Sequence, residues 1–220
     1  MTDPNLEGKR AAALKAVERV KTGMRLGLGT GSTARIVVDE IGRRLKEGTI
    51  KNIVAVPTSV ATRDQALALG IPLTTLEDQP KLDVAIDGAD EVDKAGNMIK
   101  GAGGALLWEK IVARAAKRLV IVVDKSKMVE RLGTKYALPV EVVAFGWGTH
   151  VEPIRALGAE PVLRMKAGNP YRTDEGHYLL DCKFADGIAD AAALQDKLLA
   201  RAGVVDTGLF LGFKPDVIVG

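Results

Sequence analysis

The sequence predicts an α/β fold, in which a mostly parallel sheet carries helices on both faces and a smaller α/β domain follows it. Two observations predict this fold. Short apolar runs alternate with segments of helical periodicity up to about residue 127. Beyond that point, shorter elements follow one another in the order βαββαβ.

The first part of the chain begins with a predicted helix from Leu6 to Lys21 and a short buried strand from Met24 to Leu28. The elements predicted after it are helix Ala34–Leu45, strand Ile53–Val56, helix Val60–Leu69, strand Val84–Ile86, helix Gly104–Ala116 and strand Leu119–Val123. This alternation favours a Rossmann-like sheet, mostly parallel and covered by helices on both faces.

The pattern changes after Lys127, where Gly133 and Pro139 interrupt it. The elements predicted there are strand Leu138–Val143, helix Val151–Leu157, strand Glu160–Met165, strand His177–Cys182, helix Ile188–Ala200 and strand Val204–Thr207. Their βαββαβ order is typical of a small ferredoxin-like domain. Because the apolar stretch 216–219 is expected to return to the first sheet, the predicted domains are 1–130 together with 208–220, and 131–207.

Composition excludes several classes of protein. The chain has 31 basic and 28 acidic residues and only 4% aromatic residues, so no basic face for nucleic acid is expected. No apolar run approaches the length needed to span a membrane, and the polar start lacks the apolar core of a signal peptide. We therefore expect a cytoplasmic protein without nucleic-acid or membrane partners. Cys182, the only cysteine, excludes an intrachain disulfide and is expected to pack in the core.

A glycine-rich loop follows the first predicted strand. Residues 29–34 read GTGSTA, which fits the G-x-G-x-x-A pattern of a dinucleotide site. Such a site normally needs an acidic residue at the end of the second strand, where this chain has Pro57-Thr58-Ser59. A P-loop is excluded because no Gly-Lys-Ser/Thr follows at the required distance.

Two interpretations of the loop remain. In the first, it is an anion cradle whose amides, hydroxyls and helix N-terminus bind a phosphate monoester, with contacts from Thr30, Gly31, Ser32 and Thr33. In the second, it is a tight turn in which Ser32 or Thr33 caps the next helix.

The densest group of polar residues lies between Asp83 and Lys110, which read DVAIDGADEVDKAGNMIKGAGGALLWEK. Asp87 and Asp90 flank the turn Gly88-Ala89 at the end of a strand and are expected to share a pocket. There they would hold or relay a proton.

Two further charged residues of this segment suit catalysis. Lys100 precedes the turn Gly101-Ala102-Gly103-Gly104 and would stabilise an oxyanion. Glu109 lies in the next helix and would act as a general base. Lys127, or its neighbour Lys125, follows another strand and would offer a phosphate a positive charge.

Each of these residues alone has an ordinary structural explanation, such as a turn, a helix cap or a surface charge. Their joint position at strand ends, beside glycine turns, favours function. The only histidines, His150 and His177, lie far along the chain, although the carboxylates leave binding of a hard cation open.

Seven motifs share their order and spacing with one known family over essentially the whole chain. They are GLGTGSTA at 27–34, PTS at 57–59, DGADEVD at 87–93, IKGAGGAL at 99–106 with EK at 109–110, VDKSK at 123–127, LPVEV at 138–142 and GVVDTGLF at 203–210. The chain thereby resembles ribose-5-phosphate isomerase type A. The succession DGADE, KGxGGAL and EK is the most specific part of the resemblance.

The resemblance implies interconversion of D-ribose 5-phosphate and D-ribulose 5-phosphate through a cis-enediolate, without metal or organic cofactor, in the non-oxidative pentose phosphate pathway. It makes Glu109 the base that moves a proton between C1 and C2, and Lys100 the cation that stabilises the oxyanion. Asp87 and Asp90 would assist ring opening. The implied substrate contacts are Lys9, Thr30, Gly31, Ser32, Thr33, Asp87, Gly88, Ala89, Asp90, Lys100, Gly101, Ala102, Gly103 and Lys127.

The resemblance also implies a catalytic Rossmann-like domain and a homodimer or homotetramer that binds a small pentose 5-phosphate. One departure is Trp108, where many members carry arginine, and another is the early end at Gly220. Two other functions remain open. A sugar-phosphate sensor would usually carry a helix-turn-helix extension, for which residues 1–22 are too short, and an NAD-linked oxidoreductase is weakened by the missing acidic residue.

Overall fold

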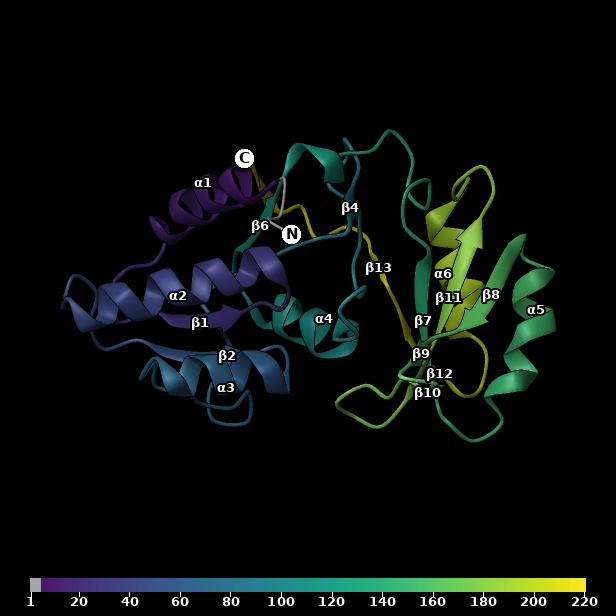
Figure 1. Ribbon diagram of the computed structural model, residues 1–220, viewed down its shortest axis with the longest axis horizontal. Coiled ribbons are helices and arrows are strands. Elements are labelled where there is room, and N and C mark those ends of the chain that lie inside the picture. The colour runs from purple at the N-terminus through teal and green to yellow at the C-terminus, as the bar shows by residue number, and fades with distance from the viewer. Residues whose placement is uncertain (1–4) are drawn as a thin grey trace. The chain divides into compact units, whose positions relative to one another are not determined.

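The computed structural model describes residues 5–220, which belong to two compact units (Figure 1). The first unit comprises Met1–Ala89, of which residues 1–4 are not described, together with Trp108–Lys127 and Phe213–Gly220. The second unit comprises Asp90–Leu107 and Met128–Gly212.

The first unit is built on a five-stranded sheet in the order β14-β6-β3-β1-β2, in which all neighbouring strands are parallel. Its strands are β1 (Arg25–Leu28), β2 (Val54–Pro57), β3 (Val84–Asp87), β6 (Leu119–Val123) and β14 (Asp216–Val219). Its helices are α1 (Leu6–Val17), α2 (Ser32–Lys46), α3 (Val60–Ala68) and most of α4 (Leu106–Ala115). The predicted return of the last apolar stretch to this sheet is confirmed, because β14 pairs with β6.

Helices cover both faces of this sheet, as the alternating pattern predicts. Leu26 and Leu28 point to the face where they join a buried core with residues of α1 and α2. Gly27 points to the opposite face, where an added Cβ would lie 2.5 Å from Val112 of α4. A glycine at this position therefore allows α4 to pack closely on β1.

The second unit contains a four-stranded antiparallel sheet in the order β12-β7-β11-β8. Its elements are β7 (Leu138–Val142), α5 (Val151–Arg155), β8 (Ala159–Leu163), β11 (Tyr178–Phe184), α6 (Ala191–Leu199) and β12 (Val204–Thr207). The predicted βαββαβ topology is confirmed (Figure 1). Cys182 lies in its core, where burial raises the pKa of the thiol, as expected of a packing residue.

Several short elements were not predicted. They are the strands β4 (Glu91–Val92), β5 (Met98–Ile99), β9 (Met165–Lys166), β10 (Asn169–Pro170) and β13 (Leu209–Phe210), and the 3-10 helices η1 (Lys125–Lys127) and η2 (Trp147–His150). Two-residue strands are too short to show an alternating pattern. Three of these strands explain why residues 90–107 belong to the second unit, because β4 and β5 form a three-stranded sheet with β13.

The compact units thus differ from the domain boundaries expected at 130 and 208, which assigned 90–107 to the first domain. Several helix ends also differ, two of them by more than two residues. Helix α1 ends at Val17 rather than Lys21, and α6 begins at Ala191 rather than Ile188. The latter start is set by Asp190, whose side chain accepts the Ala193 N–H at 3.0 Å. No helix within residues 5–220 is both long and apolar enough to cross a membrane.

Candidate active site

The strand order of the first unit creates a switch point between β1 and β3. From β1 the chain continues to β2 on one side, whereas β3 pairs with β1 on the other. Loops that leave such neighbouring strands diverge and open a crevice at the carboxyl edge, where ligands of α/β sheets bind. The two loops here are the glycine loop after β1 and the segment that follows Asp87, the last residue of β3.

Asp87 joins these two loops. Its side chain is buried, and Oδ1 accepts the N–H groups of Thr30 at 3.0 Å and Gly88 at 2.7 Å. A Cβ at Gly29 would lie 2.2 Å from the same oxygen and 2.5 Å from the Asp87 Cα. Glycine at position 29 therefore lets the backbone approach the carboxylate closely enough to hydrogen bond with it.

Gly29→Ala is expected to lower the free energy of unfolding by about 1–3 kcal/mol, because the added methyl group would overlap Asp87 backbone and side-chain atoms. Chemical denaturation measures the change. Gly88→Ala is the matched control, since its Cβ would meet only the Val122 carbonyl oxygen at 3.8 Å. Equal stability of the two variants would contradict the close contact.

Hydroxyl groups from the start of α3 support the glycine loop. Thr30 Oγ1 lies 2.7 Å from Thr58 Oγ1 and 2.9 Å from Ser59 Oγ. Thr62 Oγ1 donates to the Gly29 carbonyl at 3.0 Å. Thr58, Ser59 and Thr62 are buried and were not among the predicted site residues, although the PTS motif at 57–59 was a signal that could have found two of them. The network shows that Thr30 organises the loop.

The start of α2 tests whether Ser32 or Thr33 caps this helix. Gly31 is the N-cap, with φ 109° and ψ 176°, and no side chain caps the helix. Ser32 and Thr33 lie inside α2, so the alternative in which one of them caps it is wrong. The first-turn N–H groups of a 15-residue helix therefore leave a positive end at the loop.

Lys9 lies beside this helix end. Its Nζ donates to Ser32 Oγ at 3.1 Å, and it lines a cavity of about 810 Å³ together with Thr30, Gly31 and Ser32. The structure thus has Lys9, one of the implied substrate contacts, beside the glycine loop.

Glu109 lies on the buried face of α4. It is 5% exposed, and Val112 and Ala113, three and four residues later, are also buried. The C-terminal end of α4 lies at the amino edge of the sheet, because the Ala115 carbonyl accepts the N–H of Leu82, which precedes β3. From there α4 runs back across β1, since a Cβ at Gly27 would meet Val112, so its first turn, with Glu109, lies towards the carboxyl edge.

Lys127 follows β6, the neighbour of β3, and so leaves the sheet at the same edge. It ends η1, and its N–H donates to the Asp124 carbonyl at 3.1 Å. Lys127 is half-buried, whereas Lys125 is exposed. The buried Asp124 side chain also accepts from Ser126 and fixes this turn.

The second unit holds Asp90, Lys100 and the glycine turn after Lys100. Asp90 Oδ2 accepts the Ala102 N–H at 2.9 Å. Lys100 is 3% exposed, and its Nζ lies 5.5 Å from the centre of the Phe210 ring, a cation–π contact. Its backbone N–H donates to the Gly208 carbonyl at 2.9 Å, so the pairing of β5 with β13 anchors it.

Glu91, next to Asp90, is a structural residue that was not singled out from the sequence. It is fully buried, and its carboxylate accepts the N–H groups of Gly133 (2.6 Å), Lys135 (2.6 Å) and Tyr136 (2.7 Å). Three backbone donors satisfy the buried charge and hold β4 to the chain that leads into β7.

The predicted site residues are therefore divided between the units. The first unit contains Lys9, Thr30, Gly31, Ser32, Thr33, Asp87, Gly88, Ala89, Glu109 and Lys127, and the second contains Asp90, Lys100, Gly101, Ala102 and Gly103. Asp87 contacts the glycine loop, and Asp90 contacts the turn after Lys100. Their common pocket stays a prediction. Over residues 5–220, no three or more His, Cys, Asp or Glu side chains are grouped so as to hold a metal ion.

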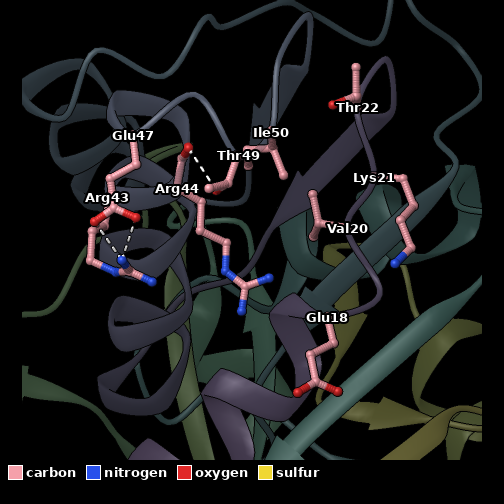
Figure 2. A pocket seen from close by; sticks show the side chains of 9 residues that line it. All are labelled: Glu18, Val20, Lys21, Thr22, Arg43, Arg44, Glu47, Thr49 and Ile50. Carbon is pink, nitrogen blue, oxygen red and sulfur yellow. Dashed lines mark hydrogen bonds and ion pairs between the residues drawn. The ribbon is translucent and has the colours of Figure 1, made fainter.

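A second cavity of the first unit, of about 540 Å³, lies at the C-terminal end of α2 (Figure 2). Its lining residues are Glu18, Val20, Lys21, Thr22, Arg43, Arg44, Glu47, Thr49 and Ile50. Arg43 pairs with Glu40 at 2.7 Å and Glu47 at 2.6 Å, and its hydrogen bonds hold the pKa of Glu40 at about 2. Because its arginines are paired internally and it lies where strands begin, this cavity is not the candidate site.

Comparison with known proteins identifies similar chains. Residues 54–220 match the family model described as ribose 5-phosphate isomerase A (phosphoriboisomerase A). The chain is 52% identical to ribose-5-phosphate isomerase A of Synechococcus sp. (strain JA-3-3Ab), over 97% of this chain and 93% of that protein. It is 48% identical to the probable ribose-5-phosphate isomerase 2 of Arabidopsis thaliana, over 97% and 83%.

Solved structures agree with these matches. A D-ribose-5-phosphate isomerase in complex with phospho-erythronic acid superimposes with a TM-score of 0.94 at 38% identity, covering 98% of this chain and 94% of that one. Ribose 5-phosphate isomerase from Plasmodium falciparum gives a TM-score of 0.93 at 38% identity, covering 96% and 92%.

Proposed function

The chain belongs to the ribose 5-phosphate isomerase A family, and from this membership we propose which of its residues carry out the reaction. The protein is an aldose–ketose isomerase that interconverts D-ribose 5-phosphate and D-ribulose 5-phosphate in the pentose phosphate pathway. The observation that carries the assignment of the site is the contact of Asp87 with the Thr30 N–H, which joins two of the family motifs at the switch point. A sugar-phosphate sensor and an NAD-linked oxidoreductase are not favoured by these matches.

Glu109 is the proposed base that moves a proton between C1 and C2. A proton on carbon next to a carbonyl group is only weakly acidic, so its removal needs a positioned base. The burial of Glu109 supports this role, because a buried side chain excludes water from the proton transfer.

Lys100 is the proposed partner of this base. Removal of the proton builds negative charge on a substrate oxygen in the cis-enediolate, and a buried ammonium group stabilises such charge more strongly than an exposed one. The 3% exposure of Lys100 and the anchoring of its backbone to Gly208 support this role. Asp87 and Asp90 would assist ring opening by passing protons among the sugar oxygens.

The phosphate is assigned to the first unit. The N-terminus of α2 offers N–H groups to an anion, because its N-cap residue is Gly31 and no side chain caps the helix. Lys9, which donates to Ser32, adds positive charge beside it. Lys127, at the same edge of the sheet, would add a point charge.

Lys127→Ala is expected to raise the KM for ribose 5-phosphate about tenfold with little change in kcat, because a phosphate contact acts nearly equally on the ground state and the transition state. Steady-state kinetics with ribose 5-phosphate measure both constants. Lys125→Ala, two residues away in the same 3-10 helix, is the matched control and should leave both constants unchanged. A raised KM in the Lys125 variant alone would move the phosphate contact to that residue.

A coupled assay that converts ribose 5-phosphate to ribulose 5-phosphate in the presence of a chelator tests the reaction and the expected lack of a cofactor together. Full turnover is expected, because every proposed step uses side chains of this chain. Loss of turnover that added divalent metal restores would contradict the proposal. The discontinuous domain with boundaries at 130 and 208, the cytoplasmic location and the homodimer or homotetramer stay predictions.

A further inference from the structure

The turn at 101–104 needs support from outside itself. Gly101 and Gly104 both have positive φ, 104° and 84°, and the Gly104 N–H donates to the Gly101 carbonyl at 2.9 Å. One hydrogen bond closes the turn, but glycine backbones reach many conformations at similar energy. The remaining contacts of the turn therefore decide which conformation is kept.

Arg164 supplies two of these contacts. Its Nη1 donates to the carbonyl oxygens of Gly101 and Ala102, each at 3.0 Å. Its Nε and Nη2 donate to the two carboxylate oxygens of Asp181 on β11, so the guanidinium plane is held from the opposite side. The Arg164 side chain is only 16% exposed, which limits competition from water.

Tyr171 supplies a third contact. Its hydroxyl donates to the Gly103 carbonyl at 3.3 Å, and a Cβ at Gly104 would lie 2.2 Å from that hydroxyl. Burial raises the pKa of Tyr171, so the hydroxyl keeps its proton and remains a donor. The Tyr171 N–H donates to the Arg164 carbonyl at 2.8 Å, which makes these two residues the base of the β9–β10 hairpin (Figure 1).

Three successive carbonyl groups of the turn thus point to the base of one hairpin. In a planar trans peptide the N–H points opposite to the C=O, so the N–H groups of Ala102 and Gly103 point away from Arg164. The Ala102 N–H reaches Asp90 Oδ2 at 2.9 Å. The Gly103 N–H faces the same side, and Gly103 is exposed.

We propose that Arg164, held by Asp181 and assisted by Tyr171, is a positioning residue that orients the turn so that the Gly103 N–H and Asp90 face oxygens of the sugar phosphate. This inference rests on the proposed role of Lys100 and its turn in binding substrate. Arginine suits the task because its planar fork binds a carboxylate and two carbonyl groups in fixed geometry, which a lysine cannot do.

The test compares substitutions at the hairpin base with a matched arginine elsewhere in the second unit. Arg164→Met is expected to lower kcat about 10²-fold, the cost of misplacing a substrate contact by about 1 Å. Arg164→Lys should recover part of the loss because it restores one donor. Tyr171→Phe, which loses one hydrogen bond, should lower kcat about two- to tenfold. Arg155→Met removes a guanidinium that pairs with exposed Glu152 and Glu160, and should leave kcat unchanged.

Thermal unfolding and the Kd of phospho-erythronic acid are measured for each variant. Folded Arg164→Met and Arg164→Lys proteins with kcat within twofold of the wild type would overturn the inference. If Arg164→Met does not fold, the inference is overturned when folded Arg164→Lys and Tyr171→Phe proteins both have a kcat within twofold of the wild type. A Lys100→Met variant distinguishes failure of the proposed function from failure of this inference. Wild-type turnover of that variant would contradict the proposed role of Lys100 and its turn in binding substrate. If Lys100→Met loses turnover but the Arg164 variants keep the kcat of the wild type, only the positioning role of Arg164 is contradicted.

Discussion

Glu109→Gln is expected to lower kcat by about 10²–10⁴-fold, the range that a positioned general base contributes. Glutamine has nearly the same shape and fits the same buried place on α4, but its amide cannot accept the proton from carbon. Binding should be largely kept, since the Kd of phospho-erythronic acid reports contacts that do not require proton transfer. Steady-state kinetics and calorimetric titration measure the two quantities.

The matched control for Glu109 is Glu47→Gln, which removes a carboxylate from an exposed glutamate at the C-cap of α2 in the same unit. Its kcat should equal that of the wild type. A Glu109 variant with near wild-type turnover would remove this residue from the mechanism and leave Asp87 or Asp90 as the candidate base.

Lys100→Met is expected to lower kcat by about 10²–10³-fold, as the loss of one donor to a developing oxyanion does in other enzymes. Methionine keeps an unbranched side chain beside Phe210, so the fold should survive the change. A cation that acts mainly on the transition state should change kcat more than KM.

Lys94→Met is the control for Lys100, because Lys94 lies in the same unit and pairs with Glu130 where both side chains are about four-fifths exposed. An exposed pair of this kind contributes little to stability, so kcat and the unfolding midpoint should stay unchanged. An equal loss of activity in both lysine variants would show that the effect of Lys100 is one of net charge and not of position.

Local patterns in the sequence predicted most of the fold. The apolar run Leu119–Val123 became a strand with the same ends, because it is a short apolar segment bounded by polar residues. The stretch Val204–Thr207 also kept its ends, which glycines flank on both sides. Helix α2 starts two residues earlier than predicted, since Gly31 forms the cap. The strands β4, β5 and β13 were not predicted because their pairing joins residues up to 112 positions apart.

The candidate site was predicted less completely than the fold. Motif spacing identified Asp87, Lys100 and Glu109, all of which are buried charged residues in the structure. The supporting residues were missed, namely Thr62 beneath the glycine loop and Arg164 behind the second turn. Their roles depend on contacts with residues 33 and 63 positions away, which local periodicity cannot report.

The sequence by itself determined the order of the longer strands and helices and the family, and it predicted the residues proposed to carry chemistry, because periodicity and motif spacing are properties of neighbouring positions. Only the tertiary structure decided that β3 lies beside β1, which creates the switch point, and that Gly29 is glycine because the Asp87 carboxylate occupies the space of a Cβ. It also placed 90–107 with the second unit. These features follow from packing between distant segments, where the space left by one residue limits another.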